Sequence, residues 1–236
     1  MAVGMGSIIR TRMINQSLQQ LRLWQLISPA LPVGSYAYSG GLESATENGW
    51  IVNQQQAQQW INDLLVNGLA HLDVPVFCRL YKACMQNDLQ QFQYWNEYLL
   101  ASRESAELLQ EDQQMGRALL RLLRDMDCSL TWCNAEEPLS FASMFASAAV
   151  NWNINEQDAA QGLLWAWCEN QVAAAIKLVP LGQTAGQQIL SELINNIPDC
   201  IDRGMQLSNE DIGFTLIGLG IISAQHETQY SRLFRS

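Results

Sequence analysis

The sequence is short of charged side chains. Only 15% of its 236 residues are Asp, Glu, Lys or Arg, whereas 48% are hydrophobic. Basic residues are the scarcer of the two signs, because 13 Lys and Arg stand against 23 Asp and Glu, a formal net charge of −10. A nucleic-acid groove needs a concentrated basic surface, so we expect no nucleic-acid partner. A surface with few charges favours association with other proteins.

Residue types for catalysis and metal binding are also scarce. The chain has two histidines, His71 and His226, which limits acid–base catalysis and nitrogen-rich metal sites. The segment GQTAG at 182–186 lacks the Gly-x-x-x-x-Gly-Lys-Ser/Thr spacing that holds phosphates, and no serine lies in a nucleophile elbow. We therefore predict that the protein is not an enzyme and has neither a metal site nor a cofactor.

The sequence has no closely spaced pair of cysteines or acidic residues that indicates a metal site or a catalytic pair. None of the six cysteines forms a Cys-x-x-Cys pair, so reduced thiols are expected rather than a zinc site. Glu111 and Asp112, like Glu136 and Glu137, are sequence neighbours and do not face each other on a helix. Both pairs are predicted to lie on a solvated surface.

Long hydrophobic runs are absent. The first sixteen residues have no continuous apolar core of the kind a signal peptide carries, so residues 1–16 are predicted to be a flexible leader of a cytoplasmic protein. The longest nearly uncharged apolar run, residues 212–224, falls short of the roughly eighteen residues that a membrane span requires. No membrane partner is expected.

Hydrophobic residues at helical spacing are present almost everywhere. Alternating runs of β-branched residues, which would indicate strands, are not found. The sequence predicts an all-α protein, a single-domain bundle of about eight to ten helices that spans residues 17–225. Residues 226–236 are predicted to form a separate C-terminal tail.

Capping residues predict where several helices begin. Asn53, Asp88 and Asn155 are predicted N-caps. The capping pattern at 208–211 predicts that the last helix begins there and runs to about Gln225. Residues 125–140 interrupt the helical pattern and predict a loop or a hinge.

Three stretches together resemble the UreF family of urease accessory proteins. They are LISPALPVGSYAYSGGLE at 26–43, AAAIKLVPLGQTAGQ at 173–187 and HETQYSRLFRS at 226–236. The resemblance implies an all-helical, homodimeric adaptor that bridges the accessory protein UreD, also called UreH, and the GTPase UreG. It further implies that nickel is delivered to apo-urease through this assembly and that the chain itself hydrolyses no nucleotide.

The tail is the first candidate for partner binding, through Tyr230, Arg232, Leu233, Phe234 and Arg235. Fixing its backbone costs more free energy than burying its three apolar side chains returns. We therefore predict that the tail does not order alone and that it folds on UreD. Bidentate hydrogen bonds from the two guanidinium groups to partner carboxylates or carbonyls would supply the difference.

The other two stretches supply further candidates. Lys177 lies in the last turn before Pro180, where a cation stabilises a helix C-terminus, and the resemblance makes it a candidate contact to UreG. The loop at 26–43 is implied to lie near the functional face, with Tyr36, Tyr38 and Glu43 as participants.

Two other functions remain open. A nickel-binding metallochaperone would use His71, His226 or the cysteines, although two separated histidines are a poor ligand supply for nickel. A regulator of the UreG GTPase would change the rate of GTP hydrolysis, but the sequence selects no candidate arginine finger.

Overall fold

The computed structural model describes residues 3–130 and 137–236, with the side chains of residues 3–14 outside the description. The described residues form ten α-helices and no strand, as the sequence predicts. The elements are α1 (Val3–Leu26), η1 (Ser35–Ala37), α2 (Leu42–Glu47), α3 (Gln54–Asp63), η2 (Leu64–Leu69), α4 (Asp73–Gln86), α5 (Leu89–Ala101), α6 (Ala106–Asp125), α7 (Phe141–Asn151), α8 (Glu156–Leu178), α9 (Gln183–Gln206), η3 (Asn209–Asp211) and α10 (Ile217–His226). None of the described helices is long and apolar enough to cross a membrane.

Local capping fixes where the helices begin. Asn53, Asp88 and Asn155 each accept a hydrogen bond from a backbone N–H of the first turn of α3, α5 or α8, so these three predictions are confirmed. Ser105 and Ser140 cap α6 and α7 in the same way. Each cap satisfies a donor that the helix itself leaves without a partner.

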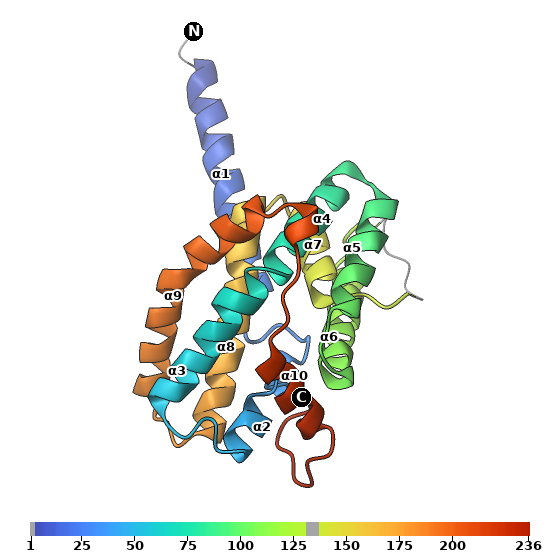
Figure 1. The fold of residues 1–236 in the computed structure, drawn as a ribbon. Coiled ribbons are helices and arrows are strands. Elements are labelled where there is room, and N and C mark those ends of the chain that lie inside the picture. Colours follow the sequence, from blue (N-terminus) through green and yellow to red (C-terminus); the bar gives the residue numbers. More distant parts are fainter. Residues whose placement is uncertain (1–2, 131–136) are drawn as a thin grey trace.

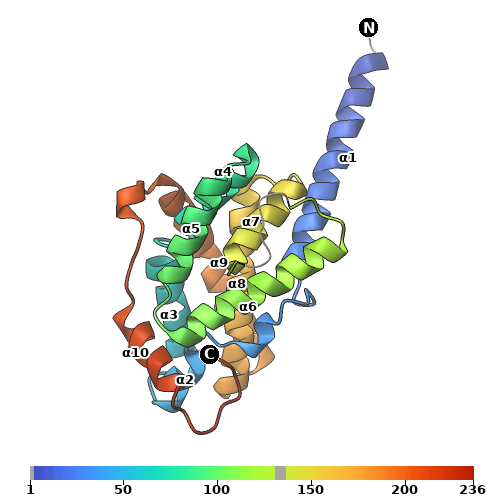
Figure 2. The ribbon, with the colours of Figure 1, turned by 90° about the vertical axis from the view of Figure 1, so that its right-hand side faces the viewer.

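Helix α7 lies at the centre of the bundle, packed against α4 and α6 (Figure 2). Its residues are mostly small and buried, which lets neighbouring backbones approach closely. The closest approach is at Gly116 of α6, where an added Cβ would lie 2.1 Å from the carbonyl oxygen of Leu139. A glycine is required there because any side chain would overlap the segment that leads into α7.

The N-terminal helix differs from the prediction. Helix α1 begins at Val3, so residues 3–16 are helical rather than a loose leader, and the helix extends away from the bundle (Figure 1). Its C-terminal end packs on α8, where Gly162 lies under Leu23 and Ile27. No proline interrupts residues 3–26, so every residue there has the backbone N–H that a helix needs.

The predicted start of the last helix is wrong. Residues 209–211 form only η3, the chain then runs extended, and α10 begins at Ile217. The Ser208 hydroxyl bonds the carboxylates of Glu210 and Asp211 instead of a backbone N–H. Long-range hydrogen bonds hold the extended segment, from Tyr98 Oη to the carbonyl of Ile212 (2.7 Å) and from the N–H of Gly213 to the carbonyl of His71 (3.0 Å).

The central break is only partly described. Helix α6 ends at Asp125 and α7 begins at Phe141, which confirms an interruption of the helical pattern between them. Residues 131–136, which include Cys133 and Glu136, lie outside the described part. The five described cysteines form no disulfide, and burial raises the pKa of the Cys78 and Cys168 thiols to about 12.

Candidate functional site

The C-terminal tail, residues 226–236, returns to the bundle after α10 and lies beside α2 and α6 (Figure 2). Phe234 is buried, with 5% of its surface exposed, and Ser236 is buried as well. The Arg235 N–H donates to the carbonyl of Ala37 (2.9 Å), and the Ser39 N–H donates to the carbonyl of Ser236 (3.1 Å). The prediction that the tail does not order on its own chain is therefore wrong.

Glu43 holds the backbone of the tail with both of its carboxylate oxygens. It lies in the first turn of α2, largely buried. Its Oε1 accepts the N–H of Leu233 (2.6 Å) and its Oε2 accepts the N–H of Phe234 (2.8 Å). Hydrogen bonds to a charged group contribute about 1.5–3 kcal/mol each. A balance of backbone entropy against apolar burial omits this term, because a sequence does not show which carboxylate meets the tail.

His226 joins Glu43 to α6. The ring has no exposed surface, and its Nδ1 lies 2.5 Å from Glu107 Oε2 while its Nε2 lies 3.2 Å from Glu43 Oε2. The ring thus lies between a carboxylate of α2 and a carboxylate of α6. The Arg232 guanidinium lies 2.6 Å from Glu107 Oε1. We call these four side chains, Glu43, Glu107, His226 and Arg232, the tail cluster.

Helix α6 meets the tail with one face. Glu107, Glu111 and Gln114 follow at spacings of four and three residues, which places them in one row. Glu111 Oε2 accepts the Ser236 hydroxyl (2.6 Å), and Gln114 Oε1 accepts the Tyr38 hydroxyl (2.6 Å). Burial raises the pKa of Glu111 to about 7. The α6 row thus holds both the end of the tail and the loop before α2.

The prediction of a solvated surface is wrong for Glu111 and Asp112. Asp112 is buried and pairs with the Arg103 guanidinium at 2.7 Å, while its other oxygen accepts the N–H of Phe141. Arg103 also pairs with Asp73 at the start of α4 (2.8 Å). The acidic pair therefore serves two internal contacts, one to the tail and one to the bundle.

The structure brings most of the predicted site residues together at the tail. Lys177 Nζ lies 5.3 Å from the ring centroid of Phe234, a cation–π contact. Tyr38 is buried beside α6. Tyr36 is not brought in, since 71% of its surface is exposed and none of the described contacts joins its side chain to the tail.

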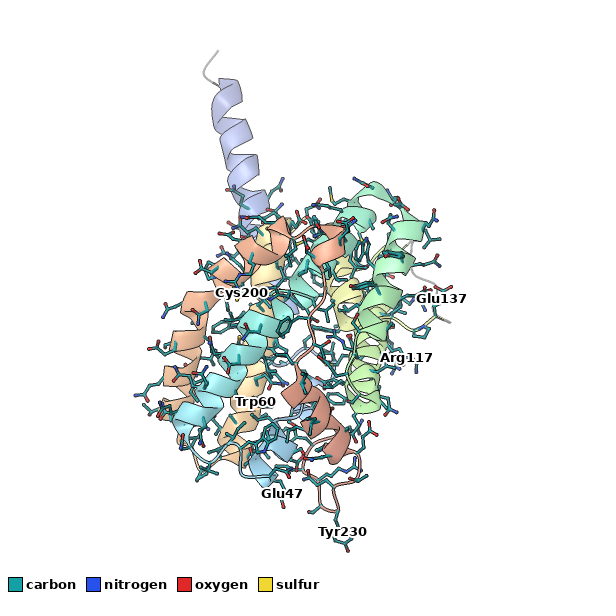
Figure 3. The ribbon with its side chains drawn as sticks, viewed as in Figure 1. Glu47, Trp60, Arg117, Glu137, Cys200 and Tyr230 are labelled. Carbon is teal, nitrogen blue, oxygen red and sulfur yellow. The ribbon has the colours of Figure 1, made fainter. Side chains whose placement is uncertain are left out.

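Two tail side chains point outward from the docked backbone. Tyr230 is fully exposed and extends from the end of the molecule (Figure 3), and Leu233 is 66% exposed. Beside them is an open hollow of about 440 Å³, lined by Glu43, Glu47, Gln229, Tyr230, Ser231, Arg232 and Leu233. The arrangement presents apolar side chains on a fixed backbone, which suits protein binding.

The described residues contain no group of three or more His, Cys, Asp or Glu side chains placed to hold a metal ion. Both nitrogens of His226 face carboxylates, and the ring of His71 packs on Phe214 at 5.7 Å between centroids.

Sequence reasoning missed the parts of the site that lie on α6 and α10. His226 carried no motif, and Glu107, Glu111 and Gln114 were not recognised as one row, although their spacing is that of a single helix face. This spacing is the sequence signal that could have identified the row. The sequence does not show that the tail covers this face, because the tail follows more than a hundred residues later.

Comparison with known proteins agrees with the resemblance noted in the sequence. The family model for UreF matches residues 51–194. A urease accessory protein UreF from Alkalilimnicola ehrlichii is 47% identical over 223 residues, which cover 94% of this chain and 98% of the relative. One from Teredinibacter turnerae is 47% identical over 222 residues, covering 92% and 99%. The chain belongs to the UreF family of urease accessory proteins, which take part in urease maturation and are not catalysts.

Proposed function

We propose that the chain is an adaptor that bridges UreD, also called UreH, and the GTPase UreG on apo-urease, so that nickel is inserted into urease. The observation that carries the proposal is the docked tail, in which Glu43 fixes the backbone while Tyr230 and Leu233 face outward. The tail is the proposed contact to UreD. The adaptor acts in the cytoplasm as a homodimer.

A tail that is already ordered gives a partner an energetic advantage. Ordering a backbone costs about 1–2 kcal/mol per residue, and the contacts to Glu43 and the α6 row offset this cost before UreD arrives. Burial of Tyr230 and Leu233, at about 1.5–3 kcal/mol each, then contributes directly to affinity. UreD is thus proposed to bind a preformed surface rather than to fold a loose peptide.

Lys177 is the proposed contact to UreG. It is exposed and lies over Phe234, so it shares a surface with the tail. Arg232 and Arg235 are exposed at the same place; Arg235 offers its guanidinium to a partner, whereas the guanidinium nitrogens of Arg232 already bond Glu107 and the carbonyls of Glu227 and Gln229. The loop that holds the end of the tail supplies Tyr36, Tyr38 and Glu43. Tyr36 is exposed and is proposed to contact a partner directly, whereas the buried Tyr38 and Glu43 hold the loop and the tail in place.

Co-purification with UreD and with UreG tests the proposal, using the full chain, a deletion of residues 229–236, and Lys177→Ala. We expect the deletion to lose UreD, and Lys177→Ala to retain UreD but weaken UreG. Tyr230→Ser with Leu233→Ser removes only exposed apolar surface and keeps the backbone hydrogen bonds, so its loss of UreD would not reflect misfolding. Full UreD binding by both tail variants would contradict the proposal.

Two measurements separate the adaptor from the other functions. Equilibrium dialysis that finds a tight stoichiometric nickel site on the isolated protein would favour a metallochaperone. A changed rate of GTP hydrolysis by UreG in the presence of this chain would favour a regulator. The adaptor proposal expects neither from this chain alone.

A further inference from the structure

The outer side of α6 carries a row of arginines. Arg117, Arg121 and Arg124 follow at spacings of four and three residues, and all three are exposed. Arg117 lies on the outer side of α6 in Figure 3. Within the described part of the chain, none of the three has a carboxylate within ion-pair distance or a side-chain hydrogen bond. Like charges at this spacing repel each other, and only Arg124, in the last turn, favours the helix through its dipole.

This row is continuous with the tail. At about 100° per residue, the three arginines lie on the flank of α6 next to the face that holds the tail, rotated from it by roughly 80° on average. Arg235 of the tail is exposed, with its Nη1 3.5 Å from Gln114 Oε1 on α6. The four arginines, 117, 121, 124 and 235, form one basic surface, which we call the arginine strip.

The strip is an exception on an acidic molecule. The formal net charge is −10, so the chain without these four positive charges carries −14. A long uniform polyanion such as a nucleic acid would be repelled by the negative charge of the rest of the protein. A protein with a confined acidic face would meet only the strip, where each guanidinium fork can bond a carboxylate with two hydrogen bonds.

We propose that the arginine strip is a docking surface for an acidic face of a protein partner in the urease-maturation assembly. The proposal rests on the adaptor function proposed above and adds a second surface to the apolar one on the tail. Opposite charges across an interface speed association and fix the orientation of the partners. The tail would then supply apolar contact while the strip aligns the partner along α6.

The test compares two variants that remove the same charge. Arg117→Gln with Arg121→Gln removes two positive charges from the strip, and Lys82→Gln with Arg203→Gln removes two from exposed positions on α4 and α9. Surface plasmon resonance measures the Kd for UreD and for UreG at 50 and 300 mM NaCl. We expect the strip variant to weaken UreD, the proposed partner of the tail, about fivefold at 50 mM and less than twofold at 300 mM, since salt screens exposed charges. The control variant should bind like the wild type.

The outcomes separate the two proposals. If the wild type binds UreD and UreG and the strip variant binds both as well as the control does, the strip proposal is overturned and the adaptor function stands. A wild type that binds neither partner contradicts both proposals. Binding of a fluorescent 20-base-pair DNA that the strip variant loses would assign the strip to nucleic acid instead. A tenfold range of protein concentration in each titration excludes self-association as the source of the signal.

Discussion

Replacing Glu43 with glutamine tests how far its carboxylate holds the tail. The carboxylate accepts two backbone N–H groups, from Leu233 and Phe234, and faces the ring of His226. Glutamine has nearly the same shape but only one acceptor oxygen. Its amide NH₂ would therefore face a donor, either a backbone N–H or the His226 ring.

The expected magnitude follows from these contacts. A hydrogen bond to a charged group contributes about 1.5–3 kcal/mol, so losing one and weakening the other lowers the free energy of tail opening by about 2–4 kcal/mol. At about 1.4 kcal/mol per factor of ten, the open population rises about 30- to 1,000-fold. The bundle itself should remain folded, because Glu43 contacts the tail rather than the central helix α7.

Hydrogen exchange measured by mass spectrometry reads this change directly. The amides of Leu233 and Phe234 should exchange faster in Glu43→Gln by that factor, while the amides of α7 keep their rates. Glu47→Gln is the matched control, since Glu47 lies one turn later on the same helix and is exposed. Equal exchange of the two tail amides in the two variants would refute the assignment of Glu43 as the anchor.

Three further changes have defined outcomes. His226→Ala leaves the buried carboxylate of Glu43 and the carboxylate of Glu107 without the ring that lies between them, so the free energy of unfolding should fall by about 1–3 kcal/mol in urea melts at pH 7; an unchanged midpoint would contradict this bridge. Because the pKa of Glu111 is raised from 4.5 to about 7 by burial, the folded state holds its proton longer than the unfolded state. The stability that this proton contributes is therefore fully present below pH 4.5 and is lost, by about 3 kcal/mol, as the pH rises from 4.5 through 7. Glu111→Gln should reduce this loss in urea melts at pH 5 and 8, and an equal loss in both proteins would contradict the prediction. Gly116→Ala should lower the thermal midpoint sharply, with Gly182→Ala, where an added Cβ meets open space, as the control; two equal midpoints would show that the close contact to Leu139 is relaxed.

Local chemistry made much of the fold predictable. Asn53, Asp88 and Asn155 cap helices with hydrogen bonds to residues three positions later, so the information lies within one turn. The capping pattern at Ser208 failed because the chain that follows is held extended by Tyr98 and by the backbone of His71. Contacts over more than a hundred residues decided that boundary, and a local pattern contains no record of them.

The site divides in the same way. The sequence identified the tail and Glu43 separately, but these partners are 190 residues apart, and a carboxylate among 23 acidic residues carries no sign that it meets backbone N–H groups. Because the sequence does not show that Glu43 pairs with the tail, it predicts a disordered tail where the structure has an ordered one. This order also changes what a partner must supply: a loose tail would need carboxylates for its arginines, whereas in the docked tail Arg232 already pairs with Glu107. On the proposed function, removing the exposed apolar surface of Tyr230 and Leu233 should therefore cost more binding than removing the charge of Arg232.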